Sequence, residues 1–199
     1  MINQIASRIT NSGIPNRKPD RIHYDGTKIW DLGGHRKFSL DTFGTKQWHL
    51  NGQLHREDGP AFEFADGGKH WYLNDKLHRE DGPAVEESNG YQAWCLNGEY
   101  HRDDGPAIID ENGSKEWYQH DNLHREDGPA IELANGSKFW YKDGKHHRED
   151  GPAVEMSNGT KEYWLNDKQV KSKDYDSPDF KKRWQKLLEL ERIRQVMED

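Results

Sequence analysis

The chain has one cysteine, Cys95, among its 199 residues. An intramolecular disulfide is therefore excluded. No stretch approaches the ~20 consecutive apolar residues that a membrane-spanning helix needs. Residues 1–18 contain no apolar run of the kind found in signal peptides. These absences predict a protein of the reducing cytoplasm that does not enter a membrane.

Motifs of common enzymes are also missing. The sequence has no glycine-rich phosphate loop, no cysteine cluster with zinc spacing and no nucleophile elbow. It therefore predicts a non-enzymatic protein without a cofactor or a bound metal.

Hydrophobic residues are scarce, at 31%, and charged residues reach 33%. That balance alone favours disorder. The eight tryptophans favour instead an ordered chain with a thin apolar layer.

Positive charge is scarce in the middle of the chain. Residues 38–167 carry a formal charge of −13, whereas residues 1–37 carry +4 and residues 168–199 carry +2. A surface this acidic repels phosphates, so the middle of the chain is not expected to bind DNA or RNA. It would suit a basic protein partner or a cation. The alternative is that the charge serves solubility alone.

What the sequence does have is a repeated phrase: His-Arg, an acidic residue, then Asp-Gly-Pro-Ala. Its histidines lie at intervals of 23 residues, at His55, His78, His101, His124 and His147. A constant period is typical of an array built from one supersecondary unit. A catalytic residue is normally needed once. Five copies in register therefore favour an architectural role for the phrase.

Turn residues divide each unit into strands. Asn-Gly or Asp-Gly recurs before an aromatic strand, as at Asp66-Gly67, and such dipeptides favour two-residue hairpin loops. Counting outward from that turn predicts that Phe62 faces Trp71. The same count in later units pairs Val85 with Trp94, Ile108 with Trp117, Ile131 with Trp140 and Val154 with Tyr163. A second turn, such as Asn74-Asp75, follows each aromatic strand.

The predicted fold is mainly β: a single-domain array of about six 23-residue β-hairpin repeats that forms an elongated antiparallel meander, capped by a C-terminal α-helix. We expect an N-terminal extension or cap over 1–23, the repeat array over 24–170, and a linker and amphipathic helix over 171–199. Ser177 and Pro178 read as the helix start. One apolar side is predicted from Phe180, Trp184, Leu187, Leu188, Leu190 and Met197. This helix could cover the last strand, dock a partner or form a homodimer.

The unit resembles a MORN-type repeat, in which an aromatic strand, an Asn-Gly turn, a histidine and a second turn follow one another. The matching residues include Trp48, Asn51-Gly52, His55 and Asp66-Gly67. Variant repeats of bacterial and viral proteins, of the YwqK-like antitoxin kind, are similar. The usual Tyr-x-Gly-x-Trp strand is absent, and Arg-x-Asp-Gly-Pro-Ala is specific to this version of the repeat. The resemblance implies a β-meander that contacts other proteins, or in some members lipids. The acidic array disfavours the lipid role.

Three hypotheses for function follow from the repeats. The first is a protein-binding scaffold, which in a phage or bacterial setting could neutralise a toxin or a host enzyme. The second is a binder or sponge for a nucleotide-like small ligand, and the third is a hydrolase that uses one His/Asp pair. The residues predicted to bind are His55, Arg56, Tyr72, His78, Arg79, His101, Arg102, Tyr118, His124, Arg125, Tyr141, His147 and Arg148.

Overall fold

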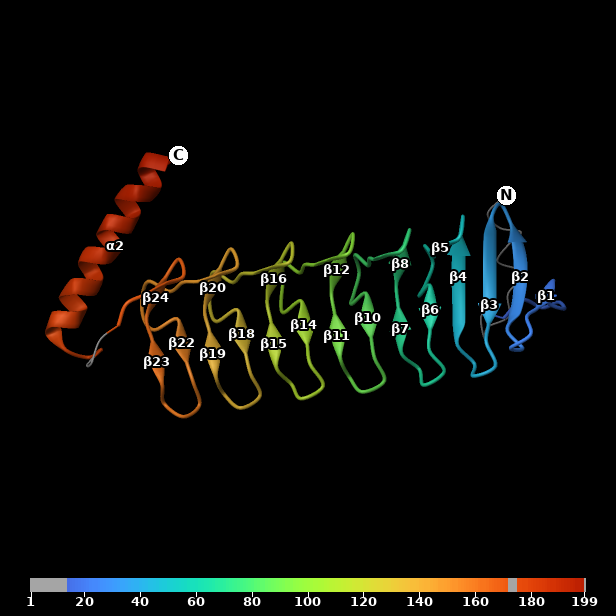
Figure 1. Ribbon diagram of the computed structural model, residues 1–199, viewed down its shortest axis with the longest axis horizontal. Helices are drawn as coiled ribbons and strands as arrows, with labels where there is room; N and C mark the ends of the chain where they lie inside the picture. The colour runs from blue at the N-terminus through green and yellow to red at the C-terminus, as the bar shows by residue number, and fades with distance from the viewer. Residues whose placement is uncertain (1–13, 172–174, 199) are drawn as a thin grey trace. The chain divides into compact units, whose positions relative to one another are not determined.

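The computed structural model describes residues 14–171 and 175–198 (Figure 1). The predicted N-terminal extension lies outside the described residues over 1–13, and the predicted linker does so over 172–174 and at 199. Contacts divide the chain into two compact units, residues 1–122 and residues 123–199. Each unit is described by itself below.

Unit 1 consists of short strands. They are β1 (Arg21–Ile22), β2 (Lys28–Gly33), β3 (Arg36–Leu40), β4 (Lys46–Leu50), β5 (Gln53–Leu54), β6 (Phe62–Glu63), β7 (Lys69–His70), β8 (Tyr72–Leu73), β9 (Lys76–Leu77), β10 (Val85–Glu86), β11 (Gln92–Ala93), β12 (Cys95–Leu96), β13 (Glu99–Tyr100), β14 (Ile108–Ile109), β15 (Lys115–Glu116) and β16 (Tyr118–Gln119). The boundary between the units falls within β17 (Asn122–Leu123).

Unit 2 continues the same pattern and ends in a helix. Its elements are β18 (Ile131–Glu132), β19 (Lys138–Phe139), β20 (Tyr141–Lys142), β21 (Lys145–His146), β22 (Val154–Glu155), β23 (Lys161–Glu162), β24 (Trp164–Leu165), β25 (Lys168–Gln169) and α2 (Pro178–Glu198). Ser177 caps α2, because its hydroxyl accepts a hydrogen bond from the backbone N–H of Phe180 at 3.2 Å. The predicted helix start is therefore confirmed.

Both units are antiparallel meanders. The neighbour order is β1-β2-β3-β4-β6-β7-β10-β11-β14-β15 in unit 1 and β18-β19-β22-β23 in unit 2. Each repeat adds one hairpin to this sheet and closes with a second, small hairpin, such as β8–β9 or β20–β21. The prediction of a mainly β meander of hairpin repeats, followed by a C-terminal helix, is confirmed.

The predicted register of the main hairpins is wrong by one residue. Phe62 faces His70, not Trp71. The same shift appears in later repeats, where Val85 faces Ala93, Ile108 faces Glu116, Ile131 faces Phe139 and Val154 faces Glu162. A shift of one residue moves every side chain of a strand to the other face of a sheet. The predicted pairing with the repeated Trp or Tyr is therefore not made in any of these hairpins, although Ile131 still faces an aromatic residue, Phe139.

The length of the hairpin loop explains the error. The N–H of Phe64 bonds the carbonyl of Gly68 at 2.8 Å, and the N–H of Gly67 bonds the carbonyl of Phe64 at 3.1 Å. Three residues therefore form the loop, and Gly67 alone among them has a positive φ, of 100°. This is a type I turn closed by a left-handed glycine, the usual three-residue hairpin. The sequence predicts the position of the loop glycine correctly, but it predicts a two-residue loop where the structure has three residues.

The two-residue turns lie instead in the small hairpins, along the upper edge of the sheet in Figure 1. Asn74 and Asp75 both have positive φ, of 53° and 62°. A pair of left-handed residues defines the type I′ turn, which asparagine and glycine tolerate best. Equivalent pairs are Asn51-Gly52, Asn97-Gly98, His120-Asp121, Asp143-Gly144 and Asn166-Asp167.

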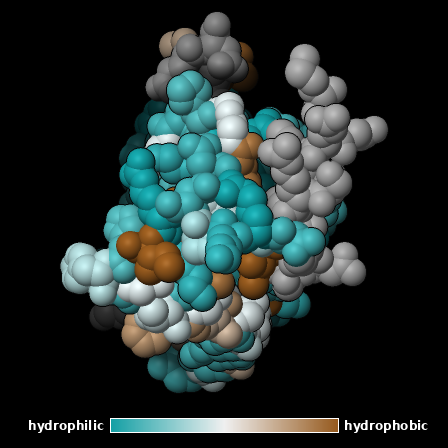
Figure 2. All heavy atoms as spheres, turned by 90° about the vertical axis from the view of Figure 1, so that its right-hand side faces the viewer, coloured by the Kyte–Doolittle hydropathy of each residue, from teal (hydrophilic) through white to brown (hydrophobic). Residues whose placement is uncertain are grey.

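The apolar layer is thin, as the composition predicts. Its smallest members are the alanines of the repeated phrase, each fully buried, at Ala61, Ala84, Ala107, Ala130 and Ala153. In unit 1, Trp30, Phe38 and Trp48 stack into a cluster with ring centroids 4.9–5.2 Å apart. The N-terminal end of this unit is mostly hydrophilic, with isolated hydrophobic patches (Figure 2).

Helix α2 covers the last hairpin of unit 2. Phe180, Trp184 and Leu188 are buried against Leu165, and the indole N–H of Trp184 donates to the carbonyl of Glu149 at 2.9 Å. Of the roles predicted for this helix, the structure shows that it covers the end of the sheet.

The predicted apolar side of α2 is too wide. Leu190 and Met197 are 52% and 81% exposed. Leu190 lies six residues after Trp184, and six steps of 100° turn it about 120° away from the packed face. These two residues were assigned wrongly to the side that packs on the sheet.

Candidate functional site: the connector row

The repeated His-Arg phrase forms a connector between one hairpin and the next. We call these segments the connectors; they are residues 55–61, 78–84 and 101–107 in unit 1 and residues 124–130 and 147–153 in unit 2. The N–H of His78 bonds the carbonyl of Trp71 in its own repeat at 3.0 Å. The next N–H, of Arg79, bonds the carbonyl of Cys95 in the following repeat at 3.1 Å. The connector backbone therefore ties successive repeats together.

The connector arginine is held on several sides. The Arg79 guanidinium lies 4.0 Å from the ring centroid of Trp71, which is a cation–π contact. It donates to Asp81 at 2.8 Å, to the carbonyl of Pro83 at 3.2 Å and to Glu86 at 2.8 Å. The hydrogen bond and the positive charge of Arg79 hold the pKa of Asp81 below its usual value. The corresponding Arg–Asp bonds, of 2.7–2.9 Å, join Arg56 to Asp58, Arg102 to Asp104, Arg125 to Asp127 and Arg148 to Asp150.

The connector glycine makes room for this arginine. A Cβ atom on Gly82 would lie 2.9 Å from Cζ of Arg79, closer than real Cβ atoms come to a neighbour. A side chain here would push the guanidinium away from its partners, so the glycine favours this arginine position through close approach and not through its φ. The Asp-Gly-Pro-Ala segment thus holds the guanidinium, which donates to Asp81 and to the Pro83 carbonyl.

The connector histidine is also engaged. Nδ1 of His78 lies 3.1 Å from Oδ1 of Asn97, the first residue of the next type I′ turn, and Nε2 lies 3.8 Å from Glu80. Equivalent Nδ1 contacts, of 2.8–2.9 Å, join His55 to Asn74, His124 to Asp143 and His147 to Asn166. The predicted binding histidines and arginines thus stabilise the array, which is the architectural role favoured by their repetition.

One repeat breaks this pattern. His120 stands where the other turns have Asn or Asp, with φ 48°. Nδ1 of His101, which should contact that position, is buried and has no hydrogen-bond partner among the described residues. A left-handed non-glycine residue costs about 1–2 kcal/mol, less for asparagine, and an unpaired buried polar atom costs about 1–3 kcal/mol.

We therefore expect His120→Asn to stabilise unit 1 by about 1 kcal/mol. The substitution also removes the ion pair between His120 and Glu99, which is exposed and contributes little, and the contact between the His120 and His101 rings, whose centroids are 4.3 Å apart. The reciprocal variant, Asn97→His, should lower stability by a similar amount. Urea denaturation of the two variants tests this, and equal midpoints for both would contradict it.

The connector surface that reaches solvent is acidic. The side chain of Asp81 is 85% exposed and that of Glu80 is 85% exposed, whereas that of Arg79 is 21% exposed. Every connector shares this arrangement: the aspartates are 82–86% exposed and the arginines 19–23%. Each connector therefore hides its cation, and each unit 1 connector presents two exposed carboxylates.

In unit 2, Glu126 pairs with Lys142 at 3.4 Å, and Glu149, which is 43% exposed, pairs with Arg192 at 2.9 Å. Sequence reasoning named the His and Arg of each connector but not these acids, although the formal charge of −13 over residues 38–167 was the available signal.

The predicted aromatic row is partly buried. Tyr72, Tyr118 and Tyr141 are each half-buried. Burial raises the pKa of Tyr118, which donates to Glu116 at 2.9 Å. Cys95 occupies the same position and is 1% exposed, and burial raises the pKa of its thiol to about 11. That thiol is a packing group, as predicted from its place in the repeat.

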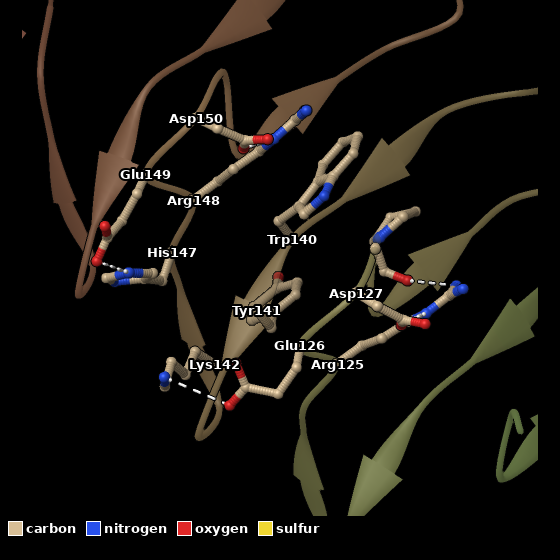
Figure 3. Close-up of a pocket in the computed structure, with 12 residues that line it drawn as sticks. Arg125, Glu126, Asp127, Trp140, Tyr141, Lys142, His147, Arg148, Glu149 and Asp150 are labelled. Atoms are coloured by element: carbon tan, nitrogen blue, oxygen red, sulfur yellow. Dashed lines mark hydrogen bonds and ion pairs between the residues drawn. The ribbon is translucent and has the colours of Figure 1, made fainter. Parts of the chain in front are cut away.

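A pocket of about 620 Å³ lies between the two connectors of unit 2 (Figure 3). Trp140 and Tyr141 line it between Asp127 on one connector and Asp150 on the other. Arg148 covers the ring of Trp140, with Cζ 3.9 Å from the ring centroid. The pocket is thus an aromatic groove with carboxylates at its rim.

Within the described ranges, no group of three or more His, Cys, Asp or Glu side chains is placed to hold a metal ion. None of the helical residues that the structure describes forms a segment long and apolar enough to cross a membrane.

Comparison of the chain with known family models, and with curated proteins, gives no match. The resemblance to MORN-type repeats therefore stays a prediction.

Proposed function

We propose that the protein is a non-enzymatic scaffold that binds a basic protein through the carboxylates of its connectors. The observation that carries the proposal is the exposed acidic pair that recurs in register in the unit 1 connectors: Glu57–Asp58, Glu80–Asp81 and Asp103–Asp104. A toxin or a host enzyme with a basic surface would be a partner of this kind.

The arginines and histidines are less suited to this contact. Arg79 already stacks on Trp71 and donates to Asp81 and Glu86. A partner that recruited it would have to replace those bonds. The carboxylates are more accessible, since the side chains of Glu80 and Asp81 are each 85% exposed. Complementary charge of this kind raises association rates.

The test uses two double variants of unit 1 with equal charge change. Glu57→Gln with Glu80→Gln removes two connector carboxylates. Asp66→Asn with Glu111→Gln removes two carboxylates from the hairpin loops, at the edge of the sheet opposite to the type I′ turns. Poly-L-lysine and cytochrome c serve as basic probes, titrated at low and physiological salt.

We expect the connector variant to weaken binding about fivefold, from two surface contacts of about 0.5 kcal/mol each. The loop variant should change binding less than twofold. Equal weakening by both variants would show that net charge alone drives binding. That result would contradict a role for the connectors.

A further inference from the structure

The Asn-Gly dipeptides of the turns carry a chemical reaction of their own. Asparagine is a thermolabile residue. The backbone nitrogen of a following glycine can attack its side-chain amide carbon, because glycine has no Cβ to hinder the approach. All the asparagines of these dipeptides are exposed, so accessibility does not decide which of them reacts. The dipeptides are Asn51-Gly52, Asn89-Gly90, Asn97-Gly98, Asn112-Gly113, Asn135-Gly136 and Asn158-Gly159.

Hydrogen bonds protect the dipeptides in the three-residue loops of the main hairpins. The attacking nitrogen must give up its proton, so a glycine N–H that is held in a hydrogen bond reacts only when the turn opens. The asparagine oxygen is engaged too, since it accepts the N–H two residues later at 2.8–3.0 Å. Each glycine N–H in these loops donates to the carbonyl three residues earlier at 2.9–3.0 Å: Gly90 to Glu87, Gly113 to Asp110, Gly136 to Leu133 and Gly159 to Met156.

Asn97-Gly98 forms a type I′ turn, which the preceding repeat protects. The N–H of Gly98 donates to the carbonyl of Leu77 at 2.8 Å. Oδ1 of Asn97 lies 3.1 Å from Nδ1 of His78 in the preceding connector. The second residue of the other later type I′ turns makes the same backbone bond at 2.9–3.1 Å: Asp75 to Leu54, Asp121 to Tyr100, Gly144 to Leu123 and Asp167 to His146.

Asn51-Gly52, the turn of the first small hairpin, β4–β5, lacks both contacts. Here it is the N–H of Asn51, not that of Gly52, that donates to the preceding hairpin, to the carbonyl of His35 at 3.0 Å. Within the described residues, neither the Gly52 N–H nor the Asn51 side chain has a hydrogen-bond partner. The cause is the β2–β3 hairpin, which turns at Gly34-His35 and is not followed by a connector.

We propose that Asn51 is the deamidation site of this protein. The Gly52 nitrogen bonds to Cγ of Asn51, the Cγ–Nδ2 bond breaks, and ammonia leaves with the proton that the nitrogen gave up. Water from the solvent then adds to the cyclic imide and breaks one of its two ring C–N bonds. The product is an aspartyl residue, or an isoaspartyl residue whose side-chain carbon has entered the backbone. Nothing is oxidised or reduced, and either product places a new carboxylate in the β4–β5 turn.

Asn97 is the matched control, because Leu96-Asn97-Gly98 repeats Leu50-Asn51-Gly52 in sequence and in turn type. The folded, full-length protein is incubated in mildly alkaline buffer, and mass spectrometry of its peptides follows the replacement of each amide by a carboxyl group. We expect Asn51 to deamidate about tenfold faster than Asn97 and the loop asparagines, because those react only when their turns open. In concentrated urea, where every turn is open, Asn51 and Asn97 should react at equal rates.

The variant Asn51→Gln assigns the reaction to its residue. Glutamine would need a larger ring, which closes far more slowly, so the mass change in this peptide should vanish. A mass change that persists would belong to another amide and would overturn the proposal. Equal rates at Asn51 and Asn97 in the folded protein would overturn it too, as would an Asn51 that stays intact in the folded protein while the unfolded chain reacts.

Discussion

Replacement of Trp184 by alanine is expected to lower the free energy of unfolding of unit 2 by about 3–5 kcal/mol, as for other buried aromatic residues. The indole is 5% exposed and packs edge-on against Tyr163, with ring centroids 5.3 Å apart. Its N–H also loses the carbonyl of Glu149. The variant therefore removes the main contact that fixes α2 on the last hairpin.

Circular dichroism during urea denaturation measures this loss, since it does not depend on the tryptophan signal. Leu190→Ala is the matched control, because Leu190 lies on the same helix and is 52% exposed. We expect the control to change stability by less than about 0.5 kcal/mol. A Trp184→Ala variant as stable as this control would show that α2 does not cover the sheet in solution.

The second large effect is expected at the connector arginine. Arg79→Ala should destabilise unit 1 by about 2–3 kcal/mol, because it removes charge-assisted hydrogen bonds and leaves the carbonyl of Pro83 without its donor. The cation–π contact with Trp71 is lost as well.

Arg79→Lys distinguishes geometry from charge. Lysine keeps the charge but cannot donate in a fork to Asp81, Glu86 and the Pro83 carbonyl together. We expect it to recover less than half of the stability lost in Arg79→Ala. Full recovery would mean that the connector needs a cation but not a guanidinium.

The repeat made much of this fold predictable. A period of 23 residues located the hairpins from the loop at Gly44 onward, and the glycines marked the loops because a left-handed residue is needed there. The β2–β3 hairpin, which turns at Gly34-His35, lies outside that period. The helix start at Ser177 and Pro178 followed from capping chemistry alone.

Loop length was not predictable from the dipeptides. Asn89-Gly90 and Asn97-Gly98 read alike in the sequence, yet the first pair ends a three-residue loop and the second forms a type I′ turn. What separates them is the hydrogen bonding of the flanking residues. Glu87 bonds Tyr91 across the first loop, whereas Cys95 pairs with Tyr100 across the second.

The candidate site was predicted in part. Repetition indicated that His78 and Arg79 are architectural, and their contacts within and between repeats agree with that. The exposed carboxylates were missed, because an acid beside an arginine looks paired in sequence. In the structure Asp81 both pairs with Arg79 and stays 85% exposed.

The central claim, that the repeated phrase is architecture and that its acids are the contact surface, is tested most directly in unit 1. Arg56→Ala, Arg79→Ala and Arg102→Ala are compared by urea denaturation and by binding to the basic peptide poly-L-lysine. The account predicts a loss of stability at all three positions, with peptide binding retained under conditions where each variant is folded. The largest loss is expected at Arg79, which donates to Glu86 at 2.8 Å. Arg56 lies 3.6 Å from Glu63, and the Arg102 connector has Ile109 at the equivalent position. One position at which binding is abolished while stability is unchanged would contradict the account.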